Sequence, residues 1–433
     1  MKMVQSISEI ITDNDAQYAF RIVKKICNEV GPGVPGSPQE LERAEIIKKE
    51  LESHLGTNNV AAEEFTFAPG AFLSSYPMCG IFMLFAALLN LSMGQIMGIS
   101  PWLTSIAALV FSIMVPFPFI FEFVLAFELF DHLFRKKKSI NVIGTVYKPG
   151  TKTAKRLLII SGHHDSAPEN TWLRFLGYGF FILLATFFIG YIFILVMSII
   201  QLLGMITDNA SLVRTGTLRW IMMVFPVLPA VIFAIFFTRK RKNGGNVPGA
   251  ADNLSASALS VAMCRFLVKN TSYIPVDTEI RFISFGGEEA GFRGSRRYVK
   301  RHADELKRLD VRLLNIETVA SPEVVLLTSD INGTVKNSPE MVKSVIAAAE
   351  RARVPFKVKP ATLGTANDSG PFSQAGLKAM TLLAFKIPQQ MVAFYHQKWD
   401  KPEILTIEPL LNVLKLTLEW IHNEGELSKK SSL

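Results

Sequence analysis

Cysteine is scarce in this sequence, and Cys27, Cys79 and Cys264 lie far apart without CxxC spacing. This scarcity excludes a disulfide framework and a cysteine-based metal site, and it is compatible with a reducing compartment. The opening stretch MKMVQSISEIITDNDAQ contains no apolar core, so we expect no secretory signal peptide. The sequence also lacks repeats of fixed period, which excludes the common solenoid and propeller arrays.

Charge is scarce too, and it is distributed unevenly. Only 19% of the 433 residues are charged, below the ~25% of typical soluble domains, and the mean hydropathy is +0.28. No charged residue occurs from Phe65 to Phe121 or from Phe175 to Thr207. Since a bilayer-spanning helix needs about 20 apolar residues, the sequence indicates membrane segments alternating with soluble ones.

The apolar stretches predict four transmembrane helices arranged as two hairpins. Their expected positions are 74–97, 102–128, 174–204 and 219–238. The predicted division of the chain is 1–73 (first part of a soluble domain), 74–134 (hairpin), 135–172 (soluble), 173–238 (hairpin) and 239–433 (main soluble part). No charged residue lies in the middle of a span, which argues against a transporter.

Basic residues predict the orientation in the membrane. The net charge is +9, and much of it lies in the runs RKKK at 135–138 and RKRK at 239–242, directly after two spans. The opposite side offers only Arg214 and Arg219. Because basic residues beside spans stay in the cytoplasm, we expect a multi-pass protein with both termini and all soluble blocks on the cytoplasmic side. This placement favours the lipid bilayer, and no nucleic acid, as the partner of the positive charge.

The soluble blocks read as an α/β domain. The stretch SPQELERAEIIKKELESHL predicts a helix with Ser37 as N-cap, Pro38 in the first turn and Glu40 completing a capping box. Its expected buried face comprises Leu41, Ala44, Ile46, Ile47, Leu51 and Leu55. The stretch VAAEEFTF predicts a strand, and residues 139–166 predict two more around a Pro-Gly turn. Residues 243–433 alternate between strand and helix patterns, which is typical of layered α/β domains.

Histidine and acidic residues gather at the ends of apolar runs in these blocks. The clusters are GHHDS (162–166), PGAADNLSA (248–256), SFGGEEAGFRGS (284–295), LLNIET (313–318) and FYHQKWD (394–400). In TEIRFISFGGEE, a strand pattern leads through two glycines to Glu288 and Glu289. The carboxyl ends of strands are where active sites form in open α/β sheets, so these clusters predict one shared site.

Adjacent glutamates suit a metal-dependent hydrolase. One carboxylate can bind a metal ion while its neighbour takes a proton from water that the metal has made more acidic. A glutamate pair alone is usually solvated helix surface, and a lone histidine in an apolar context is usually structural. The ordered set of clusters is what favours a metal site.

This order of motifs, HxD, PGAxDNxS, GGEE, a carboxylate and YH, resembles that of the co-catalytic zinc peptidases, a family of aminopeptidases and glutamate carboxypeptidases. The N-terminal GPGVPGSPQELERAEIIKKEL is similar to their opening loop and helix. The resemblance covers the soluble blocks and implies a three-layer α/β/α zinc-peptidase domain with a mixed central sheet. Here that domain would be interrupted by the two transmembrane hairpins.

The resemblance also implies a role for each motif residue. Two Zn²⁺ ions would be bound, His163 and Glu317 holding one, Glu289 and His396 the other, with Asp252 bridging both. Glu288 would be the general base, and Asp165 would orient His163. His164 would point away from the site, because successive strand residues alternate between faces.

The sequence departs from the family pattern at three places. Glu317 stands where many members have Asp, and its longer arm is expected to affect metal spacing or selectivity. Ala251 replaces the first Asp of a common Asp-Asp pair. The stretch NDSGPF at 367–372 resembles the family's Ser-Asp-x-x-Pro-Phe turn, where Asn367 or Asp368 would either cap a helix or serve the substrate side.

These features predict a membrane-bound zinc exopeptidase, with aminopeptidase favoured over carboxypeptidase, acting on a peptide substrate. One alternative is a glutaminyl cyclase-like acyl transferase with a single zinc, which would not need both His163 and Glu317 as ligands. Another is a catalytically inactive receptor or scaffold, which would be expected to have lost ligands. A divalent metal other than zinc is compatible with the same ligands, and the oligomeric state is left open.

The second hairpin separates His163 from Asp252, and short connections flank it. The chain runs only from Asp165 to Trp172 before the membrane and from Lys242 to Asp252 after it, about 25 and 36 Å at full extension. These lengths suggest an active site near the bilayer that trims lipid-anchored or amphipathic peptides. The alternative is that the hairpins only tether an enzyme that acts on soluble peptides.

Overall fold

The computed structural model describes residues 7–91, 98–151, 153–213, 216–237 and 246–431. The chain forms two compact units, each assembled from separate stretches of sequence. The sheet unit comprises Met1–Pro69, Arg135–Glu169 and Arg241–Leu433, and the helical unit comprises Gly70–Phe134 and Asn170–Lys240.

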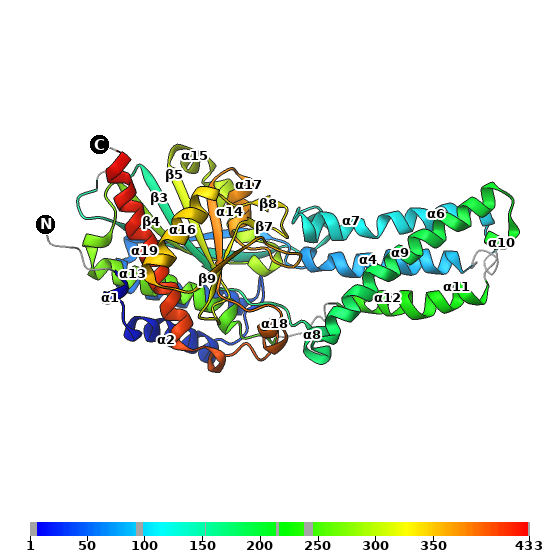
Figure 1. The fold of residues 1–433 in the computed structure, drawn as a ribbon, viewed down its shortest axis with the longest axis horizontal. Coiled ribbons are helices and arrows are strands. Elements are labelled where there is room, and N and C mark those ends of the chain that lie inside the picture. The colour runs from blue at the N-terminus through cyan, green and yellow to red at the C-terminus, as the bar shows by residue number, and fades with distance from the viewer. Residues whose placement is uncertain (1–6, 92–97, 152, 214–215, 238–245, 432–433) are drawn as a thin grey trace. The chain divides into compact units, whose positions relative to one another are not determined.

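An eight-stranded sheet forms the middle of the sheet unit (Figure 1), in the order β1-β2-β4-β3-β5-β10-β6-β9. Its central strands β4, β3, β5 and β10 are parallel, whereas β2 and β6 run antiparallel to their neighbours β4 and β10. The bounds are β1 Val60–Phe67, β2 Lys137–Tyr147, β3 Arg156–His163, β4 Thr278–Phe285, β5 Asp310–Glu317, β6 Val324–Leu327, β9 Phe356–Lys359 and β10 Lys378–Leu383. A separate pair joins β7 Ser329–Asp330 to β8 Val335–Lys336.

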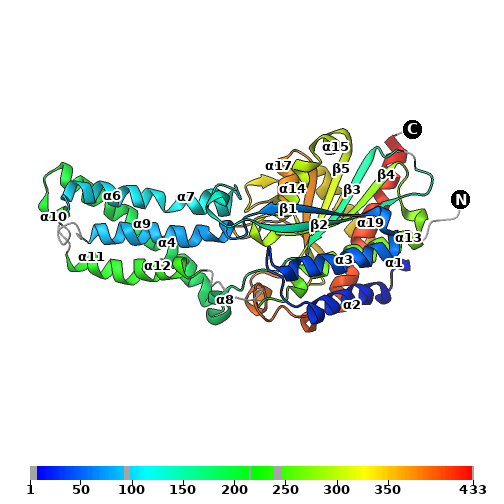
Figure 2. The ribbon, with the colours of Figure 1, turned by 180° about the vertical axis from the view of Figure 1, so that it is seen from behind.

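Apolar residues on both faces of the sheet explain its two helical layers, seen from opposite sides in Figures 1 and 2. In β3, Leu158 and Ile160 belong to one core and Leu157 and Ile159 to the other. The first core includes α1 Ile7–Ile10, α2 Asp13–Glu29, α3 Pro38–Leu55, α13 Ser255–Lys269, α16 Pro339–Ala352 and α19 Ile407–Ser431. The second includes α14 Arg293–Arg301, α15 Ala303–Arg308 and α17 Ser369–Gln374. The predicted α/β fold with a mixed central sheet is confirmed.

Helix α3 begins as expected, but Glu40 does not complete a capping box. The Ser37 hydroxyl accepts a hydrogen bond from the Glu40 N–H (3.2 Å). The Glu40 carboxylate instead accepts from the N–H of Gly36 (2.5 Å) and of Gly287 (2.8 Å) and from the Ser139 hydroxyl (2.7 Å). Leu41, expected on the buried face, is 40% exposed. The buried side of α3 therefore includes the charged residues Glu40 and Arg43, which its apolar pattern does not predict.

Among its described residues, the helical unit contains three helices long and apolar enough to cross a membrane, Ala71–Asn90, Pro101–Val124 and Gly179–Ile206. A shorter apolar helix covers Arg219–Ile235, so the fourth span remains a prediction. The elements are α4 Ala71–Asn90, α6 Pro101–Met114, α7 Pro116–Pro118, α8 Thr171–Leu176, α9 Gly179–Ile206, α10 Ala210–Val213, α11 Thr217–Met222 and α12 Leu228–Ile235. The basic run at 239–242, and Arg214, lie outside the described residues.

Hydrogen bonds between helices stabilise this bundle, and Ser198 of α9 is at their centre. Its hydroxyl lies 2.8 Å from the Asn90 side-chain nitrogen and 2.7 Å from the Ser112 hydroxyl. We expect Ser198→Ala to destabilise the bundle by ~1 kcal/mol, as for other hydrogen bonds between membrane helices, measured by thermal unfolding in detergent. Thr186→Val is the control, because Thr186 on the same helix bonds only to its own helix at Ile182. Equal effects of the two substitutions would contradict a role in helix association.

Candidate metal centre

Three neighbouring parallel strands bring the predicted site residues to one edge of the sheet. Strand β3 ends at His163, β5 ends at Glu317, and β4 ends at Phe285 just before Glu288 and Glu289. The turn after β4 requires glycine, because a Cβ on Gly286 would lie 2.3 Å from the Ser139 hydroxyl oxygen. Asp252 comes from the turn before α13, and His396 follows the short helix α18 Gln389–Ala393. The chain therefore assembles the site from five separate segments.

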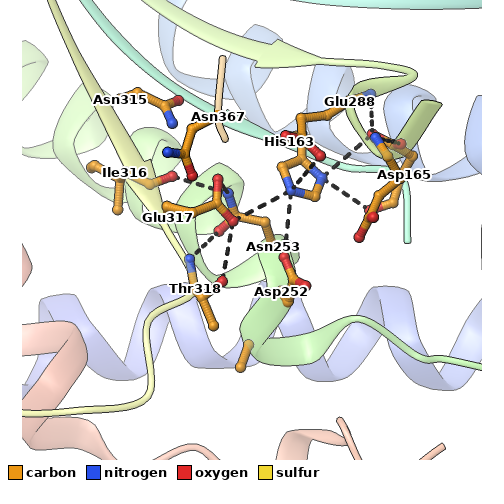
Figure 3. Close-up of polar contacts among 12 residues, drawn as sticks. His163, Asp165, Asp252, Asn253, Glu288, Asn315, Ile316, Glu317, Thr318 and Asn367 are labelled. Carbon is orange, nitrogen blue, oxygen red and sulfur yellow. Dashed lines mark hydrogen bonds and ion pairs between the residues drawn. The ribbon is translucent and has the colours of Figure 1, made fainter. Parts of the chain in front are cut away.

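Asp252 lies between the two imidazoles. Its Oδ1 is 3.5 Å from Nε2 of His163, and its Oδ2 is 3.1 Å from Nε2 of His396. On the His163 side, Glu317 Oε1 lies 3.5 Å from the same Nε2 (Figure 3). On the His396 side, Glu289 Oε1 lies 3.4 Å from Nε2. The five predicted ligands thus form two groups that share one carboxylate.

This donor set fits two divalent cations. Ligands about 2.0–2.2 Å from a tetrahedral zinc ion lie about 3.3–3.5 Å from one another, close to the separations found here. Asp252 Oδ2 and Glu289 Oε1 are buried without a hydrogen-bond partner, although buried carboxylate oxygens are normally paired. Nitrogen and carboxylate oxygen are donors that zinc commonly accepts.

Glu288 also lies close to this cluster. Its Oε2 is 3.6 Å from Nε2 of His163, so distance alone admits Glu288 as a ligand as well as a base. Burial, with the neighbouring carboxylates of Asp368 and Glu289, raises the pKa of Glu288 well above its usual value, although His163 acts in the opposite direction. Bound cations would favour the ionised form again.

Burial and nearby charges shift the pKa values of the other acidic groups as well. Burial raises the pKa of Glu289 to about 8 against the opposing charge of His396, and it raises the pKa of Glu317 to about 6. Burial alone would also raise the pKa of Asp252, but the neighbouring imidazoles of His163 and His396 outweigh it and hold that pKa below its usual value. The site therefore contains more carboxyl groups than its two imidazoles could balance if all of them were ionised.

Asp165 connects His163 to the Glu288-Glu289 turn. Its two carboxylate oxygens accept hydrogen bonds from the N–H groups of Glu288 (3.2 Å) and Glu289 (3.0 Å). With Nε2 of His163 facing the cluster, Nδ1 is the donor to Asp165, 3.2 Å from its main-chain oxygen and 3.4 Å from its carboxylate. Asp165 thus contacts both the His163 imidazole and the turn that carries Glu288.

His164 and the turn at 367–372 belong to the predicted site motifs but contain no predicted metal ligand. His164 points away from the cluster, and its Nδ1 lies 2.9 Å from the Ser284 hydroxyl. Neither expected cap of α17 forms, because Asp368 makes no side-chain cap and the Asn367 amide donates to Asp330 (3.3 Å). Burial, opposed by nearby His163, raises the pKa of the Asp368 carboxyl to about 8. A role for Asp368 beside the substrate remains a prediction.

Asp400 and Arg43 also shape the site, and sequence reasoning assigned neither. Asp400 accepts hydrogen bonds from the N–H groups of Ala251 (2.7 Å) and Asp252 (3.1 Å). The buried Arg43 donates to the main-chain oxygens of His164 (3.1 Å) and Pro248 (2.7 Å). Asp400 is the last residue of the motif FYHQKWD (394–400), four residues after His396, and this position could have identified it as a site residue. No sequence signal identified Arg43, because charged residues on such a helix are usually exposed.

We expect Asp400→Ala to destabilise the sheet unit and displace the Asp252 carboxylate. Two buried N–H groups would lose their acceptor, costing about 2 kcal/mol in total and lowering the midpoint of thermal unfolding by about 4–8 °C. Differential scanning calorimetry of the detergent-purified protein measures the shift. Exposed Asp304, whose side chain makes no hydrogen bond among the described residues, provides the control Asp304→Ala. A midpoint within 1 °C of the wild type for Asp400→Ala would contradict the role.

Comparison with known proteins identifies the domain. Residues 238–421 match the model of peptidase family M28. This part of the chain is therefore similar to a peptidase family. The M28 match contains Asp252, Glu288, Glu289, Glu317 and His396, whereas His163 lies outside it and reaches the site through β3.

Relatives of the M28 domain agree with this assignment. Aminopeptidase YwaD of Bacillus subtilis is 30% identical over 178 residues, which is 41% of this chain and 34% of that protein. The aligned part thus spans about a third of this curated relative. A zinc aminopeptidase structure from Bacillus subtilis has a TM-score of 0.53 at 17% identity, covering 94% of this chain and 95% of its own. A glutaminyl cyclase from an Acidobacteriales bacterium has a TM-score of 0.53 at 13% identity, covering 95% of both chains. These structural matches share the fold.

Proposed function

We propose that this protein is a membrane-bound exopeptidase of the aminopeptidase type that uses two zinc ions. One observation carries the proposal: the two oxygens of Asp252 face different histidines, His163 at 3.5 Å and His396 at 3.1 Å. A carboxylate shared in this way suits two neighbouring cations. The match of residues 238–421 to a peptidase family and the aminopeptidase relative support the same reaction class.

Each half of the site would hold one ion. His163 and Glu317 would bind the first, Glu289 and His396 the second, and Asp252 would bridge them. When bound, the ions supply Lewis acidity toward the attacking water and the scissile carbonyl. The chain supplies the burial that keeps these interactions strong, because His163, Asp252 and Glu317 are buried and Glu289 and His396 are partly buried.

Glu288 would move the proton. As the water oxygen attacks the carbonyl carbon, the Glu288 carboxylate takes a proton from that water. When the C–N bond breaks, Glu288 returns the proton to the leaving amine nitrogen, so the peptide and the water are consumed and an acid and an amine are released. Asp165 would keep Glu288 in place through its hydrogen bond to the Glu288 N–H.

Two further functions remain as alternatives. Solved glutaminyl cyclases share the fold. A single-zinc acyl transferase, however, would not need both His163 and Glu317 beside Asp252. An inactive receptor or scaffold would not need to retain all five ligands and the base. A shared fold does not by itself fix a function, so the metal content and the reaction must decide.

Metal counting combined with a substrate panel tests this proposal. The detergent-purified chain should bind two zinc ions by mass spectrometry of the metal content. It should release chromophore from aminoacyl substrates with a free amine and leave the N-acetylated versions intact. Cleavage of N-acetylated peptides from their carboxyl end would instead indicate a carboxypeptidase. One bound ion with cyclisation of N-terminal glutamine would support the glutaminyl cyclase alternative, and no bound ion would support the scaffold.

The membrane arrangement is a second part of the proposal. The long apolar helices support a multi-pass protein, and the basic runs in the sequence support cytoplasmic soluble blocks. Protease treatment of sealed inverted vesicles should therefore digest the sheet unit. Cleavage of a lipidated peptide should be compared with that of its unlipidated version in liposomes. Equal efficiencies would favour simple tethering over an enzyme specialised for membrane-bound peptides.

A further inference from the structure

The carboxylate of Glu317 is held from both sides (Figure 3). Its Oε2 accepts a hydrogen bond from the Asn253 side-chain amide (3.1 Å), and its Oε1 accepts one from the Thr318 hydroxyl (3.1 Å). The same Oε1 lies 3.5 Å from Nε2 of His163. Both bonds leave the carboxylate aimed at the His163 half of the site.

Asn253 is itself fixed by the end of β5. Its amide nitrogen also donates to the main-chain oxygen of Ile316 (2.9 Å), and its side-chain oxygen accepts from the N–H of Thr318 (3.2 Å). The side chain is fully buried. Because Asn253 directly follows Asp252, one side chain joins the bridging carboxylate to the strand that carries Glu317.

Thr318 adopts a backbone conformation that β-branched residues rarely use. Its φ of 42° lies in the left-handed region. Such a conformation persists where the surroundings determine it, and it is common at functional sites. Here it accompanies two contacts, the N–H bond to Asn253 and the hydroxyl bond to Glu317.

We propose that Asn253 and Thr318 are positioning residues that set the metal affinity of the half formed by His163, Asp252 and Glu317. A glutamate arm has one more rotatable bond than an aspartate, and ordering it costs conformational entropy. The two hydrogen bonds restrain that arm before a metal binds. This inference rests on the proposed two-metal function. Losing such support typically lowers metal affinity about 10- to 100-fold.

Zinc titration of the apo protein, followed with a competing chelator, tests the inference. The wild type should bind two ions tightly. Asn253→Ala and Thr318→Val should bind one ion as tightly as the wild type and the other about 10- to 100-fold more weakly. Thr318→Ser keeps the hydroxyl and should restore both affinities. Asn337→Ala is the matched control, because Asn337 is a buried asparagine that bonds to the main-chain oxygen of Leu327.

A combination of variants identifies the affected half. Glu289→Ala removes a ligand from the other half and should leave one tight ion. The double variant Glu289→Ala with Asn253→Ala should retain no tightly bound ion. Two unchanged affinities in Asn253→Ala and Thr318→Val, with a normal wild type, would overturn the inference. Fewer than two ions in the wild type would instead overturn the proposed function. If Asn253→Ala does not fold, the comparison of Thr318→Val with Thr318→Ser still decides.

Discussion

Replacing Glu288 by Gln is expected to lower kcat/KM on aminoacyl substrates by about 10²–10⁴-fold, the usual contribution of a general base. Gln keeps the size of the side chain and the main-chain bond to Asp165, but it cannot accept a proton at neutral pH. Both zinc ions should remain bound, because in the proposed arrangement Glu288 is a base and no ligand. Steady-state kinetics and metal content measured on one preparation provide the test.

The adjacent Glu289 provides the matched control for this prediction. Glu289→Gln should lose or weaken one zinc ion, since its Oε1 lies 3.4 Å from Nε2 of His396. The two variants differ by a single position but should differ in metal content. A zinc ion lost from Glu288→Gln would show that Glu288 is a ligand, as its 3.6 Å distance from Nε2 of His163 allows. Full activity in Glu288→Gln would contradict its role as base.

Asp252→Asn should have the largest effect on metal binding. The substitution keeps the shape of the side chain but replaces one carboxylate oxygen with an NH₂ group, which cannot act as a ligand. Both halves use this side chain, so we expect both affinities to fall and kcat/KM to fall more than about 10³-fold, since the Lewis-acid contribution is worth several kcal/mol. Isothermal titration with zinc measures the affinities directly.

Asp330→Asn is the control for the loss of a buried carboxylate. Asp330 is also fully buried, but it accepts hydrogen bonds from Ile331, Asn367 and Ser369, away from the metal ligands. This variant should lose stability while retaining two zinc ions. Tight binding of two ions by Asp252→Asn would refute the bridging role, whatever its activity.

The sequence predicted that these residues lie close together, because several of them follow strand ends. Parallel strands place their carboxyl ends together, so His163, Glu288 and Glu317 could be assigned to one edge without knowledge of strand order. What the pattern could not supply was the order itself: β4 lies between β2 and β3, although it follows both in the chain. Pairing between distant segments depends on tertiary packing, which local periodicity does not encode.

Buried charge was the main feature that sequence reasoning missed. Glu40 and Arg43 lie on a helix with many charged residues, and such residues are usually exposed. Both are fully buried, and both bond to main-chain groups of distant loops. Their partners are loop groups that no sequence spacing identifies. In the first turn of this helix Glu40 is the buried residue, and its neighbour Leu41 is exposed.

The fourth predicted span contains a change in helix geometry. Its apolar stretch predicts a span at 219–238; the described apolar helix covers Arg219–Ile235, residue 238 lies outside the described residues, and the span stays a prediction. A wider turn at Met223–Val227 accompanies Pro226, whose missing N–H and bulky ring disturb regular helix hydrogen bonding. Hydropathy counts residues and does not register such changes in helix geometry.

The central position of β3 has a consequence for biosynthesis. Its two neighbours, β4 and β5, are synthesised only after the whole second apolar hairpin, and β4 begins roughly 115 residues after β3 ends, or ~6–23 s at typical elongation rates. Throughout that interval the nascent β3 has two unpaired edges and an apolar surface that invites aggregation. The sheet can therefore form only after the second apolar hairpin has been synthesised and inserted. Cells producing this protein should depend on chaperones that cover the unpaired β3 during that interval.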